Sequence, residues 1–141
     1  MPDKNTFTFG SASVRCTRMK TGVMRVEFSG PLSLEAFVWL RNCLVQRLEI
    51  AAGYVMHYER ALMALGDLPP APPTMYNSSA PPTAVICRFD QLGYWRAFSM
   101  RVARMGVVRP CFLDLRADAA YQWVESMAVA RERPQLRVLQ Q

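Results

Sequence analysis

The sequence predicts an α/β fold in which a mixed sheet of about five strands, opening with an N-terminal antiparallel hairpin, packs against three main helices. Two observations support this prediction. Residues 84–128 alternate short apolar runs with helical patterns at short joints, which is typical of parallel strands joined by helices. Residues 13–19 and 23–28 alternate apolar and polar side chains around a short turn at 20–22, which indicates a hairpin with one buried face.

Length and composition narrow the class of protein. A chain of 141 residues with 51% hydrophobic and 20% charged residues is typical of one globular domain, which we expect to span residues 1–141. No apolar run approaches the roughly 18 residues of a membrane span, and residues 1–13 lack the basic and apolar segments of a signal peptide. We therefore expect a cytoplasmic protein without membrane insertion.

The cysteines and the single histidine do not indicate a metal site. Cys16, Cys43, Cys87 and Cys111 are widely spaced and lie in apolar or alternating stretches, so we expect reduced, buried thiols. A zinc site needs clustered cysteine and histidine ligands, and the only histidine is His57. No metal and no cofactor are expected.

The formal net charge of +6 comes almost entirely from arginine. The basic residues are spread over predicted helices and strands and do not form the dense cluster of a phosphate-binding surface. Nucleic acid is therefore not the expected partner.

Capping residues and side-chain type locate the elements that follow the hairpin. Ser33 is expected to cap a helix that runs to about Leu48, and Glu35 favours its first turn. Residues 54–58 have strand-forming side chains, whereas residues 59–65 are rich in helix formers. We expect a short strand there, followed by a helical turn or two.

The sequence of the C-terminal half predicts a strand, a helix, a second strand and a second helix, in that order. Asp90 is expected to cap a helix that Gly106 ends, and the next strand starts at Pro110. The final helix is expected to stop at Pro134, before a tail or short edge strand at 135–141. Four of its side chains should face the sheet: Ala120, Trp123, Val124 and Met127.

Residues 66–83 form the one change of composition, because six of the ten prolines lie there. Paired prolines hold the chain extended, and loops of this length are uncommon unless they are functional or disordered. An extended proline segment loses little entropy when it docks, so this loop is the best candidate for a recognition element. The alternative is a solvated, flexible loop. The candidate interaction residues are Pro69, Pro70, Pro72, Pro73, Met75 and Tyr76.

A few residue positions point to a known family. A strand ends at Phe28-Ser29-Gly30, and a helix begins in the pattern Leu32-Ser33-Leu34-Glu35; later, Phe112 in a strand is followed by Ala120 and Trp123. Over roughly residues 14–128 this arrangement resembles the STAS-like family of anti-sigma-factor antagonists and sulfate-transporter regulatory domains, in particular a bacterial branch. The resemblance implies a STAS-like fold with a regulatory role.

The phosphorylation motif of that family is missing from the expected place. Family members carry Asp-x-Ser-Gly at a strand end, with the serine phosphorylated at a helix N-terminus. Here the corresponding strand is expected at 54–58, and Glu59-Arg60-Ala61 follows it without a serine or threonine. The resemblance therefore implies a domain that lacks the phospho-switch.

His57 is the first candidate for acid–base chemistry, because histidine alone titrates near neutrality without perturbation. Glu59 lies two residues on and would share its face of a strand. A catalytic His57 would need a cleft and a second polar group within hydrogen-bond reach. The alternative is a surface histidine or one whose hydrogen bonds are satisfied. Ser78 and Ser79 lack the surroundings of a nucleophile elbow.

Other pairs have a structural interpretation as well as a chemical one. Asp114 and Asp118 could form a carboxylate pair, but acidic residues are also favoured at a helix start. Tyr94 and Trp95 lie beside arginines and could stack on bases, although a tryptophan on an apolar stripe usually belongs to a core.

These observations predict a non-enzymatic protein that regulates by binding an unidentified protein partner. A homodimer is one form of that interaction. The alternative is a binder of a small apolar ligand or lipid, because nine methionines and several aromatic residues can line an adaptable pocket.

Overall fold

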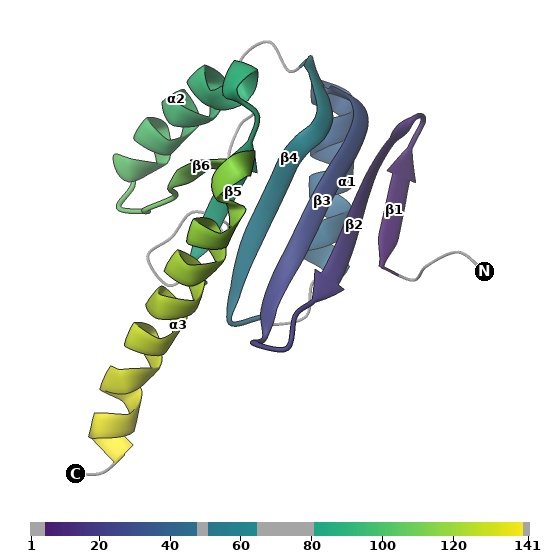
Figure 1. The fold of residues 1–141 in the computed structure, drawn as a ribbon. Coiled ribbons are helices and arrows are strands. Elements are labelled where there is room, and N and C mark those ends of the chain that lie inside the picture. Colours follow the sequence, from purple (N-terminus) through teal and green to yellow (C-terminus); the bar gives the residue numbers. More distant parts are fainter. Residues whose placement is uncertain (1–4, 48–50, 65–80, 140–141) are drawn as a thin grey trace.

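The computed structural model describes residues 5–47, 51–64 and 81–139, which form a six-stranded mixed sheet and three α-helices (Figure 1). The strands lie in sequence order across the sheet; β1, β2 and β3 pair antiparallel, and β3 to β6 pair parallel. Their bounds are β1 Thr6–Phe9, β2 Ala12–Arg18, β3 Val23–Ser33, β4 Gly53–Ala64, β5 Thr83–Cys87 and β6 Cys111–Leu113. The helices are α1 Leu34–Arg47, α2 Leu92–Ala103 and α3 Ala117–Leu139, with short 3₁₀ turns η2 Phe89–Gln91 and η3 Asp114–Arg116.

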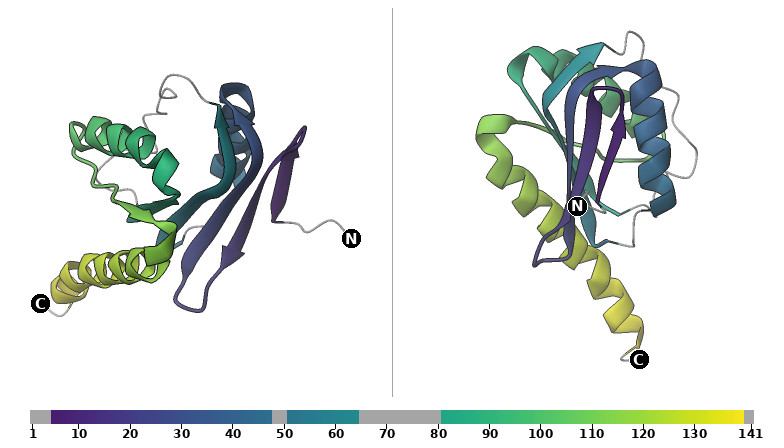
Figure 2. Two further views of the ribbon diagram at one scale, coloured as in Figure 1. Left: turned by 45° about the horizontal axis from the view of Figure 1, so that its top comes forward. Right: turned by 90° about the vertical axis from the view of Figure 1, so that its right-hand side faces the viewer.

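The helices cover both faces of the sheet. The buried side chains of α1 and α2 share one apolar cluster with β2, β3 and β4, so these two helices lie on the same face. The first turns of α3 pack on the opposite face, against β3, β4 and β5. Figure 2 shows that α3 then runs past the end of the sheet. The molecule therefore has three layers, helix, sheet and helix, with one face covered more fully than the other.

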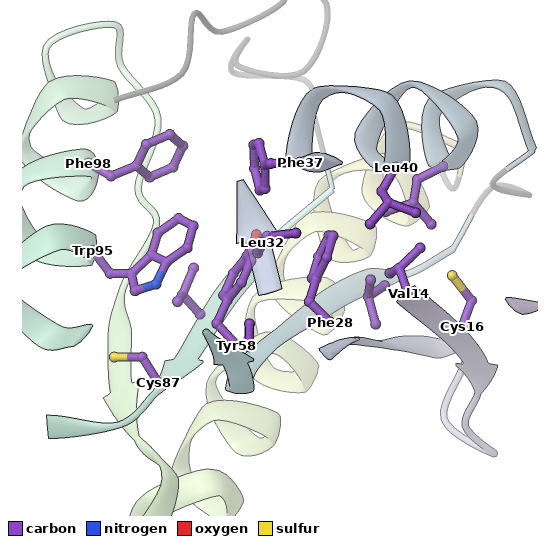
Figure 3. Packing of buried hydrophobic residues seen from close by; sticks show 14 of the residues in the cluster. Val14, Cys16, Phe28, Leu32, Phe37, Leu40, Tyr58, Cys87, Trp95 and Phe98 are labelled. Atoms are coloured by element: carbon purple, nitrogen blue, oxygen red, sulfur yellow. The ribbon is translucent and has the colours of Figure 1, made fainter. Parts of the chain in front are cut away.

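Aromatic stacking organises the core beneath α1 and α2 (Figure 3). The Tyr58 ring lies between Trp95 and Phe28, with ring centroids 4.0 Å and 4.9 Å away. Phe37 from α1 stacks on Phe28, and Phe98 from α2 meets the edge of Trp95. Contacts of this kind add stabilisation to that from burying the large apolar area, so this layer holds β3, β4 and both helices together.

The core beneath α3 is smaller and tighter. Ala120 and Val124 of α3 pack on four aliphatic side chains of the sheet: Val23, Val55, Ala84 and Ile86. Gly53 lies directly below the helix, and a Cβ there would collide with Val124 and would lie 2.8 Å from the Pro82 carbonyl oxygen. The small side chains on both sides allow α3 to approach the sheet closely.

The predicted fold class is confirmed, including the mixed sheet, its N-terminal antiparallel hairpin and the three helices. The predicted cap of the first helix is also confirmed, because the Ala36 N–H donates to Ser33 Oγ at 3.1 Å. Gly106, with a φ of 81°, follows the end of α2 as expected.

Two strands differ from the prediction. Residues 6–9 form an additional strand, β1, because Phe7 and Phe9 pack against the main core and hold its backbone beside β2. The expected helical turn after residue 58 is wrong, since β4 continues to Ala64. Pairing with β3 from Ser29 to Ser33 and burial of Ala61 outweigh the weak helix preference of that segment.

Two helix boundaries also differ. Asp90 does not cap α2; it lies in the 3₁₀ turn ahead of the helix, where its carboxylate binds Arg88. Pro134 does not end α3, whose backbone stays helical to Leu139, so residues 135–139 form neither a tail nor a strand. Proline has a helical φ, and its ring removes one backbone hydrogen bond without forbidding the turns beyond it.

Candidate functional site

The sheet face beside α3 carries polar side chains where the helix does not cover it. Alternation along β3 and β4 directs Arg25, Glu27, His57 and Glu59 to this face, while their neighbours enter the aromatic core. Arg15, Glu27 and His57 lie opposite one another in a row across β2, β3 and β4. Adjacent strands thus bring acidic and basic groups together at the rim of α3.

His57 is the centre of this polar group, and both of its ring nitrogens are engaged. Nδ1 lies 2.8 Å from Glu59 Oε1, and Nε2 lies 2.7 Å from the Tyr121 hydroxyl. In the neutral ring, Nδ1–H donates to the carboxylate and the Tyr121 O–H donates to Nε2. Since His57 is buried, this chain of hydrogen bonds links α3 to β4 inside the protein.

A bulge in β4 explains how Glu59 reaches His57. Glu27 pairs with His57, but Ser29 pairs with Arg60, so β4 has one extra residue in this interval. Glu59 remains on the His57 side, and the extra residue returns Ala61 to the aromatic core. Without the bulge, Ala61 would point away from that core.

The surroundings of the two groups favour an ionised Glu59 carboxylate and a protonated Tyr121 hydroxyl. Burial alone would raise the pKa of Glu59, but the hydrogen bond from His57 and the positive charges of His57 and Arg25 outweigh it and lower that pKa. Burial raises the pKa of Tyr121 to about 12. At neutral pH, Glu59 is therefore ionised and Tyr121 keeps its proton.

This arrangement meets part of the requirement for a catalytic His57. The expected polar groups are within hydrogen-bond reach, but Glu59 and Tyr121 occupy both ring nitrogens. A general base needs a free nitrogen facing its substrate. The network therefore fits the alternative interpretation, a satisfied histidine that fastens α3 to the sheet.

A second feature lies at the carboxyl edge, which we define as the last residues of β4, 60–64, and the short turns that follow β5 and β6, residues 88–91 and 114–116. Three large apolar side chains there are exposed: Leu62 by 64%, Phe89 by 79% and Leu115 by 92%. Parallel strands end on the same side of a sheet, so these side chains share one rim of the molecule. Several large apolar side chains exposed at one end of a sheet are a common mark of a binding surface.

Two side chains hold the carboxyl edge in place. The last pair between β4 and β5 is His57 with Ile86, so the next carbonyls of β4 have no partner from β5. The Gln91 side-chain amide donates to the Tyr58 and Ala61 carbonyls at 2.9 and 3.0 Å. The Arg88 guanidinium donates to the carbonyls of Glu59 and Ala61. These bonds fix the turn that carries Phe89 against β4.

Charged side chains of both signs surround the apolar groups. Arg88 binds the exposed Asp90 carboxylate through Nε and Nη2, at 3.0 and 3.3 Å. Three further exposed charges lie on the same turns and on β4: Arg60, Asp114 and Arg116. An apolar centre with a mixed polar rim is the usual composition of a protein–protein interface.

The structure shows where the remaining residues lie that the sequence offered as candidates for binding or catalysis. Trp95 belongs to the core, as its alternative interpretation proposed. Asp114 and Asp118 lie in the first turns of η3 and α3, and Asp114 accepts from the Leu115 N–H at 3.1 Å. Among the described residues, no cluster of histidine, cysteine or acidic side chains could hold a metal ion.

The candidate interaction loop lies outside the described residues, as do Ser78 and Ser79. Its prediction therefore stays untested. The loop residues in question are Pro69, Pro70, Pro72, Pro73, Met75 and Tyr76.

Several residues of these two features were not expected from the sequence. Tyr121 had no local signal, because it lies 64 positions from His57. Phe89 and Leu115 did have one: each is an apolar residue in a very short joint directly after a strand, where no core position is available.

Comparisons with known proteins add no family assignment. The chain has no significant match to a protein-family model, a curated protein or a solved structure. None of the helices in the described part of the chain combines the length and the apolarity that crossing a bilayer requires.

Proposed function

We propose that this protein is a non-enzymatic regulatory module that binds a protein partner through its carboxyl edge. The observation that carries the proposal is the exposure of Leu62, Phe89 and Leu115 at the ends of three neighbouring parallel strands. Single exposed apolar residues are ordinary, but such a group at one rim costs solubility unless it is covered.

The rigidity of the edge supports this role. Arg88 and Gln91 tie the β5–α2 turn to backbone carbonyls of β4, so Phe89 is presented on a fixed turn. A surface that is already ordered loses less entropy on binding. The surrounding mixture of arginine and aspartate suits a protein surface better than a uniformly charged partner.

The state of His57 supports the absence of catalysis. Its ring nitrogens serve Glu59 and Tyr121, and the phenol of Tyr121 stays protonated at neutral pH. The acid–base candidates of the sequence are thus used to hold α3.

The STAS-like relationship belongs to the same proposal. It is supported by the strand-to-helix passage from Phe28 to Glu35 and by Trp123, a partly buried residue of α3 that packs against the smaller core between this helix and the sheet. β4 ends at Ala64, and the first hydroxyl side chain beyond it is Thr74. Regulation by this protein would therefore not use a serine at the end of that strand. The proline-rich segment, which follows β4 in the sequence, stays a second candidate element for recognition.

Site-specific photo-crosslinking tests the proposal. A benzophenone amino acid placed at position 89 or 115 in the producing cells should capture the same protein from both positions. The control is position 129, because Val129 is exposed and lies roughly three helical turns along α3 from the end of the helix that follows η3. The captured protein, once purified, should bind the wild-type chain and lose affinity for the Phe89→Ser/Leu115→Ser double variant by at least about tenfold. Equal capture from all three positions, or unchanged affinity of the double variant, would falsify the proposal.

A further inference from the structure

The outer face of α2 differs from the rest of the surface in its charge. Between Gln91 and Leu113 the chain has four arginines and no acidic residue. Arg96 and Arg101 are exposed on α2 and Arg104 is exposed at its C-cap, and none of the three has a hydrogen bond or ion pair among the described residues. Figure 1 places this helix on the side of the molecule away from β1.

The helix orientation is set by its buried side. Trp95, Phe98 and Val102 enter the aromatic core, so the opposite side of α2 must face solvent. Arg96, Met100 and Arg104 are spaced by four residues, which places them in one row along that outer side. The exposed face is therefore a methionine with an arginine one turn before it and one turn after it.

Apolar side chains extend this face beyond the helix. Met100 is 66% exposed, and Val108, in the segment that leads to β6, is 68% exposed. Met105 lies between them and is also exposed. The surface thus combines positive charge with flexible and branched apolar groups, and it has no acidic residue to oppose an anion.

We propose that this α2 face, defined by Arg96, Met100, Arg101, Arg104 and Val108, binds the surface of an anionic lipid membrane without crossing it. Basic side chains are attracted to anionic headgroups, and neighbouring apolar side chains enter the boundary with the acyl chains. The long arginine side chains can keep their guanidinium groups among the headgroups while Met100 goes deeper.

Two other occupants fit the face less well. Nucleic acid would match the charge, but its phosphates offer nothing to the exposed apolar side chains of Met100, between the arginines, and Val108, beyond the helix. A second copy of the chain would need an acidic counterpart.

That counterpart is missing from the described part of the chain. Glu27, Glu59 and Asp90 are paired with basic groups of their own chain. The remaining acidic residues whose side chains the structure describes are scattered: Glu35, Asp114, Asp118 and Glu125.

Vesicle co-sedimentation provides the test. The full chain is mixed at about 0.1 M salt with vesicles of phosphatidylcholine alone or with about 30% phosphatidylserine. We expect binding only to the anionic vesicles. The Arg96→Gln/Arg101→Gln/Arg104→Gln variant should bind them about a hundredfold more weakly, since each basic residue near such a surface contributes about fivefold. Met100→Ser should weaken binding severalfold at every salt concentration.

The matched control removes the same charge elsewhere. Arg18, Lys20 and Arg131 are exposed and lie off both α2 and the carboxyl edge, so the Arg18→Gln/Lys20→Gln/Arg131→Gln variant should keep most of the affinity. Circular dichroism checks that every variant is folded.

Three outcomes would overturn the proposal. The first is equal weakening by both triple variants, which would indicate a net-charge effect. The second is no sedimentation of the wild type with anionic vesicles. The third is binding to a short DNA duplex that is tighter than binding to vesicles and unaffected by Met100→Ser, which would assign the face to nucleic acid.

Discussion

The two faces of the sheet are held in different ways. Beneath α1 and α2, Tyr58 is stacked between Phe28 and Trp95, and large aromatic surfaces are buried. Beneath α3, small residues permit close approach, and the chain of hydrogen bonds from Tyr121 through His57 to Glu59 fastens the helix.

The two faces therefore make different contributions: one mainly to the free energy of folding, the other to its dependence on charged groups. The aromatic face contributes most of the free energy of folding because the hydrophobic effect scales with the apolar area removed from water. The α3 face contributes less, but it holds ionisable groups whose interactions change with pH. β4 belongs to both faces, and its outer half leads to the carboxyl edge.

The largest expected effect comes from the aromatic face. Trp95→Ala should lower the free energy of unfolding by about 3–5 kcal/mol, since it removes a fully buried side chain and the stack on Tyr58. Urea denaturation followed by circular dichroism measures this loss. Trp39→Ala is the matched control, because Trp39 is 44% exposed and its ring packs beside Phe9 of the edge strand β1. Similar losses in the two variants would contradict the assignment of the aromatic face as the main source of stability.

A smaller effect is expected where β4 runs beyond its last pair with β5. Gln91→Ala removes the two hydrogen bonds from the Gln91 amide to the Tyr58 and Ala61 carbonyls and should cost about 1–3 kcal/mol. The backbone amides of residues 88–92 should also exchange their hydrogens faster. Gln122→Ala, at an exposed position of α3, should leave stability nearly unchanged. If Gln91→Ala behaves like this control, the carboxyl edge is not held by Gln91.

On the α3 face, Tyr121→Phe should cost about 1 kcal/mol because His57 Nε2 loses its donor. Glu59→Gln perturbs the same ring from its other nitrogen. The two substitutions should therefore be less than additive in the double variant. Strict additivity of the unfolding free energies would show that the three side chains do not act as one network.

The smallest effect is a dependence on pH. The pKa of Glu59 is lowered in the folded protein, so its stabilising contribution is complete above the ordinary carboxyl pKa and is lost as pH falls through the lowered value. The stability difference between wild type and Glu59→Gln should therefore stay constant from about pH 7 to 5 and shrink below about pH 4.5. A difference that stays constant down to about pH 3 would contradict this role of Glu59.

The parts of the fold that depend on local pattern could be predicted from the sequence. The hairpin and the cap at Ser33 follow from alternation and from side-chain chemistry within a few residues. The outer half of β4 could not be predicted, because its pairing with β3 is long-range and its residues favour a helix locally. The continuation of α3 past Pro134 was missed because proline is a frequent but not an obligatory helix end.

The residues of the candidate site also divide into those that local spacing predicts and those that depend on long-range contacts. That His57 and Glu59 share one face followed from their spacing, whereas the contact with Tyr121 depends on how α3 crosses the sheet. The exposure of Phe89 and Leu115 required the positions of three strand ends together. The predicted role of the proline-rich loop remains a prediction.

Native mass spectrometry of the chain purified from its own host tests the central claim, binding of a protein partner at the carboxyl edge. The account predicts the bare mass of the chain without a reproducible small adduct, together with a complex that contains one additional protein. That complex should disappear in the Phe89→Ser/Leu115→Ser variant and persist in Val129→Ser. A reproducible small adduct that survives in the double variant, with no protein complex in the wild type, would contradict the account and favour a ligand-binding protein.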